Sequence, residues 1–212
     1  MVKNKVEKNS IGFPKNQGLY DSSKEHDSCG VGFIVDTNNN ASHDIVSKGL
    51  SMLCNLEHRG AVGADPKAGD GSGILLQIPH EFFKKEIDHF ELPEKNEYAV
   101  GVFFLKKNDE LRDKILKKIE EVCNKENIPF LGWRICPTYE DELGWSVKPT
   151  TPYVYHLFVE KPDNVIEQDD FERKIYVLRQ CIDKEIMSMG NEYYDQFYIP
   201  SFSSRTILYK GM

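Results

Sequence analysis

The order of the expected strands constrains the fold of this chain more than any other sequence feature. Short apolar runs that fit strands lie at residues 30–35, 74–78, 98–105, 130–135, 153–159, 197–202 and 206–209. Helix-length segments separate some of these runs, and such alternation favours a doubly wound parallel sheet. Other runs follow one another directly, and we expect 197–202 and 206–209 to pair around Ser203-Ser204-Arg205. That pattern favours a sheet with antiparallel pairs and helices on its faces, so the residues alone leave both arrangements open.

Three longer segments have the apolar period of amphipathic helices. The first follows Asn40 or Ser42, either of which fits an N-cap, and the others are residues 109–125 and 171–189. Their expected inner faces consist of Ile45, Val46, Gly49, Leu50, Leu53 and Leu56, then Leu111, Ile115, Ile119 and Val122, then Ile175, Leu178, Ile182 and Ile186. Pro79 is expected to start a short helix that contains Phe82 and Phe83.

Composition and charge exclude several classes of protein. The net charge is −7 and no basic run occurs, which argues against a nucleic-acid partner. No apolar stretch approaches the roughly 20 residues that span a bilayer, and the polar start of the chain does not lead into a signal-peptide core. The five cysteines are odd in number and lack C-x-x-C spacing. They therefore predict a reducing compartment such as the cytoplasm, with no metal site in this segment.

The character of the chain changes sharply at Cys29. Residues 1–28 are polar and resemble a leader, whereas the run after Cys29 is expected to form a buried strand. Removal of the leader would give Cys29 both a thiol and a free α-amine. Because that amine has a pKa of about 7.7–8.0, it can accept the thiol proton at neutral pH. The small residues Gly30 and Gly32 would allow close approach to this group, while the simpler interpretation of Cys29 is a buried structural cysteine.

Four other features of the sequence are candidate sites. Glu57-His58-Arg59-Gly60 fits a solvated helix end, but Arg59 is also placed to order the chain near Cys29, and His58 is a weaker candidate base. Gly69-Asp70-Gly71-Ser72-Gly73 lacks the lysine of a P-loop and precedes a strand, so we expect a tight loop at a cleft instead of a nucleotide site. Asp27 and Arg205 are expected at the surface, although Arg205 also fits a pocket wall.

Several sequence blocks together resemble the N-terminal glutamine amidotransferase domain of glutamate synthases. They are CGVGFIVD from Cys29, NLEHRGAVGAD, GDGSGIL, YAVGVFFL, LGWR, FERKIY and FYIPSFSSRTILYKGM, in the family's order. The resemblance extends from about Gly18 to Met212. It implies a class II amidotransferase of the N-terminal-nucleophile hydrolase type, an α+β fold with a four-layer αββα sandwich of antiparallel sheets, incomplete in this chain.

The resemblance also implies the chemistry. Cys29 corresponds to the family nucleophile, residues 1–28 to a propeptide, and Arg59 to an arginine that orders the site. The implied reaction is hydrolysis of L-glutamine, with the ammonia used to aminate 2-oxoglutarate. The implied FMN and iron–sulfur cluster belong to downstream domains, and the electron donor would be a small reductase subunit or ferredoxin. The location would be the cytoplasm, or a plastid in a plant or alga.

Two family blocks, of the types HSRFSTN and HNGEIN, follow the YKGM segment in the family and do not occur here. They supply the substrate clamp and the oxyanion hole, so we expect residues 1–212 alone to be inactive. The alternatives are a non-catalytic binding or regulatory segment of the same ancestry, and the amidotransferase domain of another class II enzyme.

Overall fold

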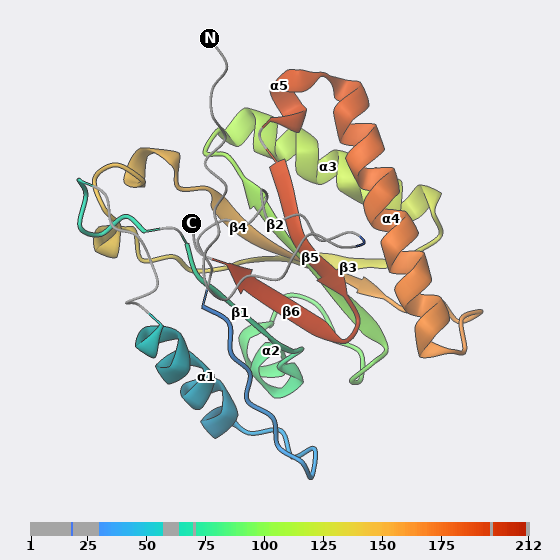
Figure 1. The fold of residues 1–212 in the computed structure, drawn as a ribbon. Helices are drawn as coiled ribbons and strands as arrows, with labels where there is room; N and C mark the ends of the chain where they lie inside the picture. The colour runs from blue at the N-terminus through green and yellow to red at the C-terminus, as the bar shows by residue number, and fades with distance from the viewer. Residues whose placement is uncertain (1–17, 19–29, 57–63, 70, 196, 211–212) are drawn as a thin grey trace.

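The fold is seen in a computed structural model that describes residues 18, 30–56, 64–69, 71–195 and 197–210. Its centre is an antiparallel sheet with the strand order β3-β4-β2-β5 (Figure 1). These strands are β2 (Tyr98–Leu105), β3 (Phe130–Ile135), β4 (Tyr153–Glu160) and β5 (Phe197–Ser203). Every residue of β2 is buried, because this inner strand has other structure against both of its faces. The antiparallel register settles the choice that the sequence left open.

Two long helices, α3 (Asp109–Lys125) and α4 (Gln168–Met189), cover one face of this sheet. Except for Leu111, which is half-buried and outside it, their expected apolar stripes form the larger core with Ala99, Phe103 and Leu105 of β2. Asn108 caps α3 by accepting a hydrogen bond from the N–H of Leu111 at 3.1 Å. The predicted bounds of α3 are confirmed, and those of α4 differ at its start only.

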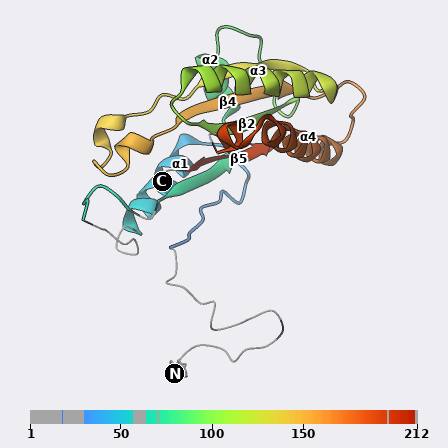
Figure 2. The same cartoon turned by 90° about the horizontal axis from the view of Figure 1, so that it is seen from above.

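The other face of the sheet carries a smaller core under α2 (His80–Glu86) and a second, two-stranded antiparallel sheet. That sheet pairs β1 (Gly73–Gln77) with β6 (Thr206–Lys210). Helix α1 (His43–Asn55) contacts β1 and, in both views, lies away from α3 and α4 (Figures 1 and 2). The layers therefore run helix, sheet, sheet, helix, which agrees with the expected sandwich. The remaining elements are η3 (Glu140–Glu142), η4 (Lys148–Thr150) and α5 (Asn191–Tyr194).

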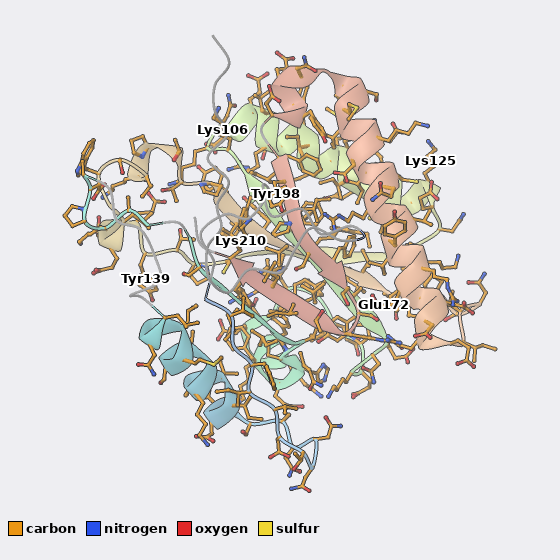
Figure 3. The ribbon with its side chains drawn as sticks, in the orientation of Figure 1. Lys106, Lys125, Tyr139, Glu172, Tyr198 and Lys210 are labelled. Atoms are coloured by element: carbon orange, nitrogen blue, oxygen red, sulfur yellow. The ribbon has the colours of Figure 1, made fainter. Side chains whose placement is uncertain are left out.

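The expected pairing of the last two strands with each other is wrong. β5 pairs with β2 and β6 pairs with β1, so the chain passes from one sheet to the other at Ser203-Ser204-Arg205. The corner is held by Glu172 of α4, which accepts hydrogen bonds from the N–H of Ser204 at 2.6 Å and from both serine hydroxyls. Figure 3 labels Glu172 on α4 near this corner. Within the described ranges, no helix has the length and apolar character needed to cross a membrane.

Candidate functional site

The two residues predicted to matter most, Cys29 and Arg59, lie outside the described residues, as do Asp27 and His58. Their immediate neighbours are described, however. Gly30 follows Cys29 directly, and Leu56 precedes Arg59 by three positions. These two neighbours are in contact, since a Cβ built on Gly30 would lie 2.9 Å from Cδ2 of Leu56. The structure therefore brings the chain on either side of the predicted site together at the end of α1.

A glycine pair allows the segment after Cys29 to lie directly on α1. A Cβ on Gly32 would lie 2.3 Å from Sδ of Met52, just as one on Gly30 would meet Leu56. Alternate residues of an extended chain are separated by about 6.6 Å, and positions i and i+4 of a helix by about 6 Å along its axis. The Gly-x-Gly spacing therefore matches one turn of α1. The sequence indicated a close approach at these glycines, and in the structure the approaching groups are the side chains of Met52 in α1 and of Leu56, the residue that follows it.

The prediction that residues 30–35 form a buried strand is wrong. The segment is neither helix nor strand, and Val31 and Phe33 are 89% and 86% exposed. Side chains alternate along an extended chain, so the two residues that follow the glycines point away from α1. Ile34, on the glycine side, is only 37% exposed. The apolar composition is that of a strand, but a strand also needs a neighbouring backbone to pair with.

The glycine-rich loop lies beside the same helix. Gly71 has φ of +90°, as expected for a tight loop, and the chain continues into β1 as predicted. Helix α1 packs on that strand, because a Cβ on Gly49 would lie 3.3 Å from Cδ1 of Ile74. Ser72 and Gly73 line a cavity, which agrees with the expected position of this loop at a cleft. Asp70 lies outside the described residues.

That cavity has a volume of about 310 Å³ and opens between the two sheets near α1. Its lining is mostly apolar and consists of Leu53, Ser72, Gly73, Ile74, Val102, Phe104, Cys136, Thr138, Val154, Tyr209 and Lys210. Burial raises the pKa of Tyr209 to about 12, so its phenol is protonated at neutral pH. Burial also raises the pKa of the Cys136 thiol, and the nearby Arg134 opposes this shift. Lys210, labelled in Figure 3, lies with Nζ 5.5 Å from the ring centre of Tyr198.

Other predicted positions take structural roles. Arg205 is exposed and forms an ion pair with Asp169, so the surface interpretation holds. The described cysteines, Cys54, Cys123, Cys136 and Cys181, are free thiols. Cys123 is fully buried in the larger core and its pKa is raised to about 12, mainly by burial. Among the residues that the structure describes, no group of three or more histidine, cysteine or acidic side chains could hold a metal ion.

Sequence reasoning missed one residue beside the site, Met52, and one buried carboxylate elsewhere, Asp65. Met52 was left out of the expected face of α1, although its spacing from Leu56 places both on the same side. Asp65 was noticed only as a letter of the NLEHRGAVGAD block. The structure shows it as a buried carboxylate bound to a loop 81 residues away, a contact for which the sequence carries no local signal.

Comparison with known proteins agrees with the resemblance. The family model for class II glutamine amidotransferases matches residues 29–212. The chain is 41% identical over 199 residues to the large chain of glutamate synthase (NADPH) of Bacillus subtilis. It is 39% identical over 210 residues to glutamate synthase (NADH) of Saccharomyces cerevisiae, and 37% over 199 residues to the ferredoxin-dependent glutamate synthase of Pyropia yezoensis. These alignments cover 93–94% of this chain but only 10–13% of the relatives.

Proposed function

The chain belongs to the class II glutamine amidotransferases, and from this membership we propose that it hydrolyses L-glutamine to glutamate and ammonia with Cys29 as the nucleophile. The observation that carries the proposal is the close packing of Gly30 against Leu56, at the C-terminal end of α1, and of Gly32 against Met52. A nucleophile must be held in a fixed place, and this packing fixes Gly30, the residue next to Cys29. The family match also begins at residue 29, the position of the nucleophile in the proposal.

The proposed reaction requires a free α-amine on Cys29. In an uncut chain this nitrogen is part of the amide bond to Ser28, where its lone pair is delocalised and cannot accept the thiol proton. We therefore propose that residues 1–28 are removed by the Cys29 thiol, which attacks the Ser28 carbonyl carbon. The Ser28–Cys29 C–N bond breaks, the nitrogen takes the thiol proton to become the free α-amine, and water hydrolyses the resulting thioester to release residues 1–28. In the mature enzyme the thiol proton passes to the α-amine as sulfur bonds to the glutamine amide carbon. The amide nitrogen then leaves with a proton as ammonia, and water cleaves the thioester to give glutamate.

Arg59 is proposed to order the chain around the nucleophile. It lies three residues beyond Leu56, and Leu56 contacts Gly30. An arginine there can donate several hydrogen bonds in a fixed planar arrangement, which suits the fixing of nearby backbone carbonyls. Its role is thus to hold the surroundings of Cys29, and not to take part in proton transfer.

In the complete protein we propose that the ammonia aminates 2-oxoglutarate to form a second glutamate. The relatives are glutamate synthases whose names specify NADPH, NADH or ferredoxin. Their length beyond the matched region leaves room for the FMN and iron–sulfur domains implied by the resemblance. The partners would be that remaining chain and a reductase subunit or ferredoxin. We place the reaction in the cytoplasm, or in a plastid, since an Arabidopsis thaliana relative is named as chloroplastic.

The experiment that tests this proposal compares two nitrogen sources in the complete protein. Cys29→Ala should abolish glutamate formation from glutamine and 2-oxoglutarate, while externally supplied ammonia is still used, because the thiol acts only in amide cleavage. Intact-mass analysis should show a mature wild-type chain that starts at Cys29 and a variant that keeps residues 1–28. Glutaminase activity in the variant would refute the assignment. A variant trimmed at the same bond would refute only self-cleavage.

A further inference from the structure

Gly49 lies in the middle of helix α1, a costly place for a glycine. Apart from proline, glycine is the poorest helix former, so this residue weakens the helix that it belongs to. The neighbouring strand supplies a reason for it. A Cβ on residue 49 would lie 3.3 Å from Cδ1 of Ile74 in β1, which is closer than two carbon atoms normally pack. The absence of a side chain at Gly49 therefore sets how closely α1 lies against β1.

The side of α1 that carries Gly49 also carries the contacts to Gly30 and Gly32. Met52 lies three residues beyond Gly49 and Leu56 lies seven beyond it, and both spacings return to the same side of a helix. Met52 lies against Gly32, and Leu56, the C-cap of α1, lies against Gly30. One side of α1 therefore rests both on β1 and on the segment that follows the proposed nucleophile.

Ile74 has little freedom to make way for a larger residue at position 49. It is branched at Cβ, which restricts its rotation, and it is paired with Tyr209 across β1 and β6. The cavity that Ile74 and Leu53 line gives its terminal methyl group some room to turn. A valine at position 49 would extend one bond further than an alanine, so we expect the displacement of α1 to grow with the size of the side chain.

We propose that Gly49 is a positioning residue for glutamine hydrolysis. Without a side chain at this position, α1 lies close to Ile74, and its C-terminal end holds Gly30 beside the proposed nucleophile. This inference rests on the proposed function, and Gly49 does not touch the substrate. A larger residue lifts α1 from β1 and loosens its hold on Gly30. The use of glutamine is then impaired, and the use of ammonia is spared.

The test uses the complete protein with Gly49→Val and a matched control, Ser47→Val. Both changes place a valine in α1, but Ser47 is exposed. Gly49→Val should lower kcat/KM for glutamine by roughly 10- to 100-fold and leave the ammonia-dependent rate unchanged, and Gly49→Ala should lose less. Ser47→Val should leave both rates unchanged. Valine and alanine are better helix formers than glycine, so a loss at position 49 cannot come from a weaker helix.

A compensating change on β1 tests the contact itself. Ile74→Ala removes as many carbon atoms as Gly49→Val adds, so the double variant keeps the volume between the helix and the strand. It should recover most of the glutamine-dependent activity that Gly49→Val loses. No recovery, equal losses with glutamine and ammonia, or full glutamine-dependent activity in Gly49→Val would each overturn the inference. Failure of the proposed function looks different, because Cys29→Ala would then keep its glutamine-dependent activity.

Discussion

The buried imidazole of His156 makes the stability of this domain depend on pH. His156 on β4 is fully buried, and its ring lies 5.7 Å, centre to centre, from the rings of Phe83 and Tyr209. Neither ring nitrogen has a hydrogen-bond partner among the described residues. The opposite position on β3 is Arg134, which is paired with Glu86 at 3.1 Å. Burial first, and the charge of Arg134 second, lower the pKa of His156 to about 3.

The sign of the effect follows from proton uptake. Between pH 6.5 and pH 3 the unfolded chain binds a proton at this histidine and the folded chain does not, so stability falls as the pH falls. One pH unit corresponds to about 1.4 kcal/mol. At pH 5 the loss relative to pH 8 is therefore about 2 kcal/mol, and below pH 3 it levels off at about 5 kcal/mol. The first value alone is a large part of the stability of a typical domain.

The assay is urea unfolding at pH 8 and pH 5, followed by tryptophan fluorescence, in which Trp133 reports on the larger core against which it packs. His156→Phe removes the titrating group and keeps a ring among aromatic neighbours. Its unfolding free energy relative to wild type should rise by about 2 kcal/mol on going from pH 8 to pH 5. His156→Gln should show the same pH effect even if it is less stable overall. Replacement of the exposed His43 by Gln is the control, and equal differences at both pH values would refute the reasoning.

Two further predictions concern the packing of Gly30 and Gly32 against Leu56 and Met52, and the corner between the two sheets. Gly30→Ala should reduce glutamine-dependent activity of the complete protein by roughly 10- to 100-fold, and more than Gly32→Ala. A new methyl group on residue 30 would lie 3.2 Å from Cβ of Leu56, which cannot rotate away, whereas one on residue 32 would meet Sδ of Met52, which can. Equal losses of activity in the two variants would contradict this reasoning. Glu172→Gln should lower the unfolding free energy by about 2 kcal/mol, because Ser204 loses a charged acceptor. Asp169→Asn removes an exposed ion pair with Arg205 and should change the unfolding free energy little. If urea unfolding shows the same loss of free energy in both variants, Glu172 does not hold the corner.

Local patterns predicted the elements whose signals are strong and self-contained. The bounds of β2 and α3 were correct to the residue, since β2 is a short apolar run with charged residues beyond both of its ends and α3 has the apolar period of a helix. The pairing of β5 and β6 was not predictable in the same way. It depends on Glu172, a residue of α4 that lies 31 positions before Ser203 and turns the chain from one sheet to the other.

Only those site residues could be predicted whose side-chain type itself indicates a chemical role. Cys29 and Arg59 were proposed from the chain and its resemblance, and their own placement stays a prediction. The hydrogen bonds between Asp65 and Ser146 could not be predicted, because a carboxylate in a loop is ordinarily a surface group and Ser146 is remote in sequence. The exposure of Val31 was missed for a related reason. An apolar run shows that side chains can be buried, and it does not say which neighbours are present.

Helix α1 brings the segment after Cys29, strand β1 and the cavity close together. Gly49 and Leu53 face β1 and the cavity, while Met52 and Leu56 face the segment after Cys29. At 100° per residue, these four positions occupy a sector of about 100° on one side of the helix. A face this narrow places the segment after Cys29 beside β1 and the cavity, and not across the helix from them. The position of the segment next to Cys29 is thus set by the period of one helix, even though the helix itself contains none of the proposed chemical groups.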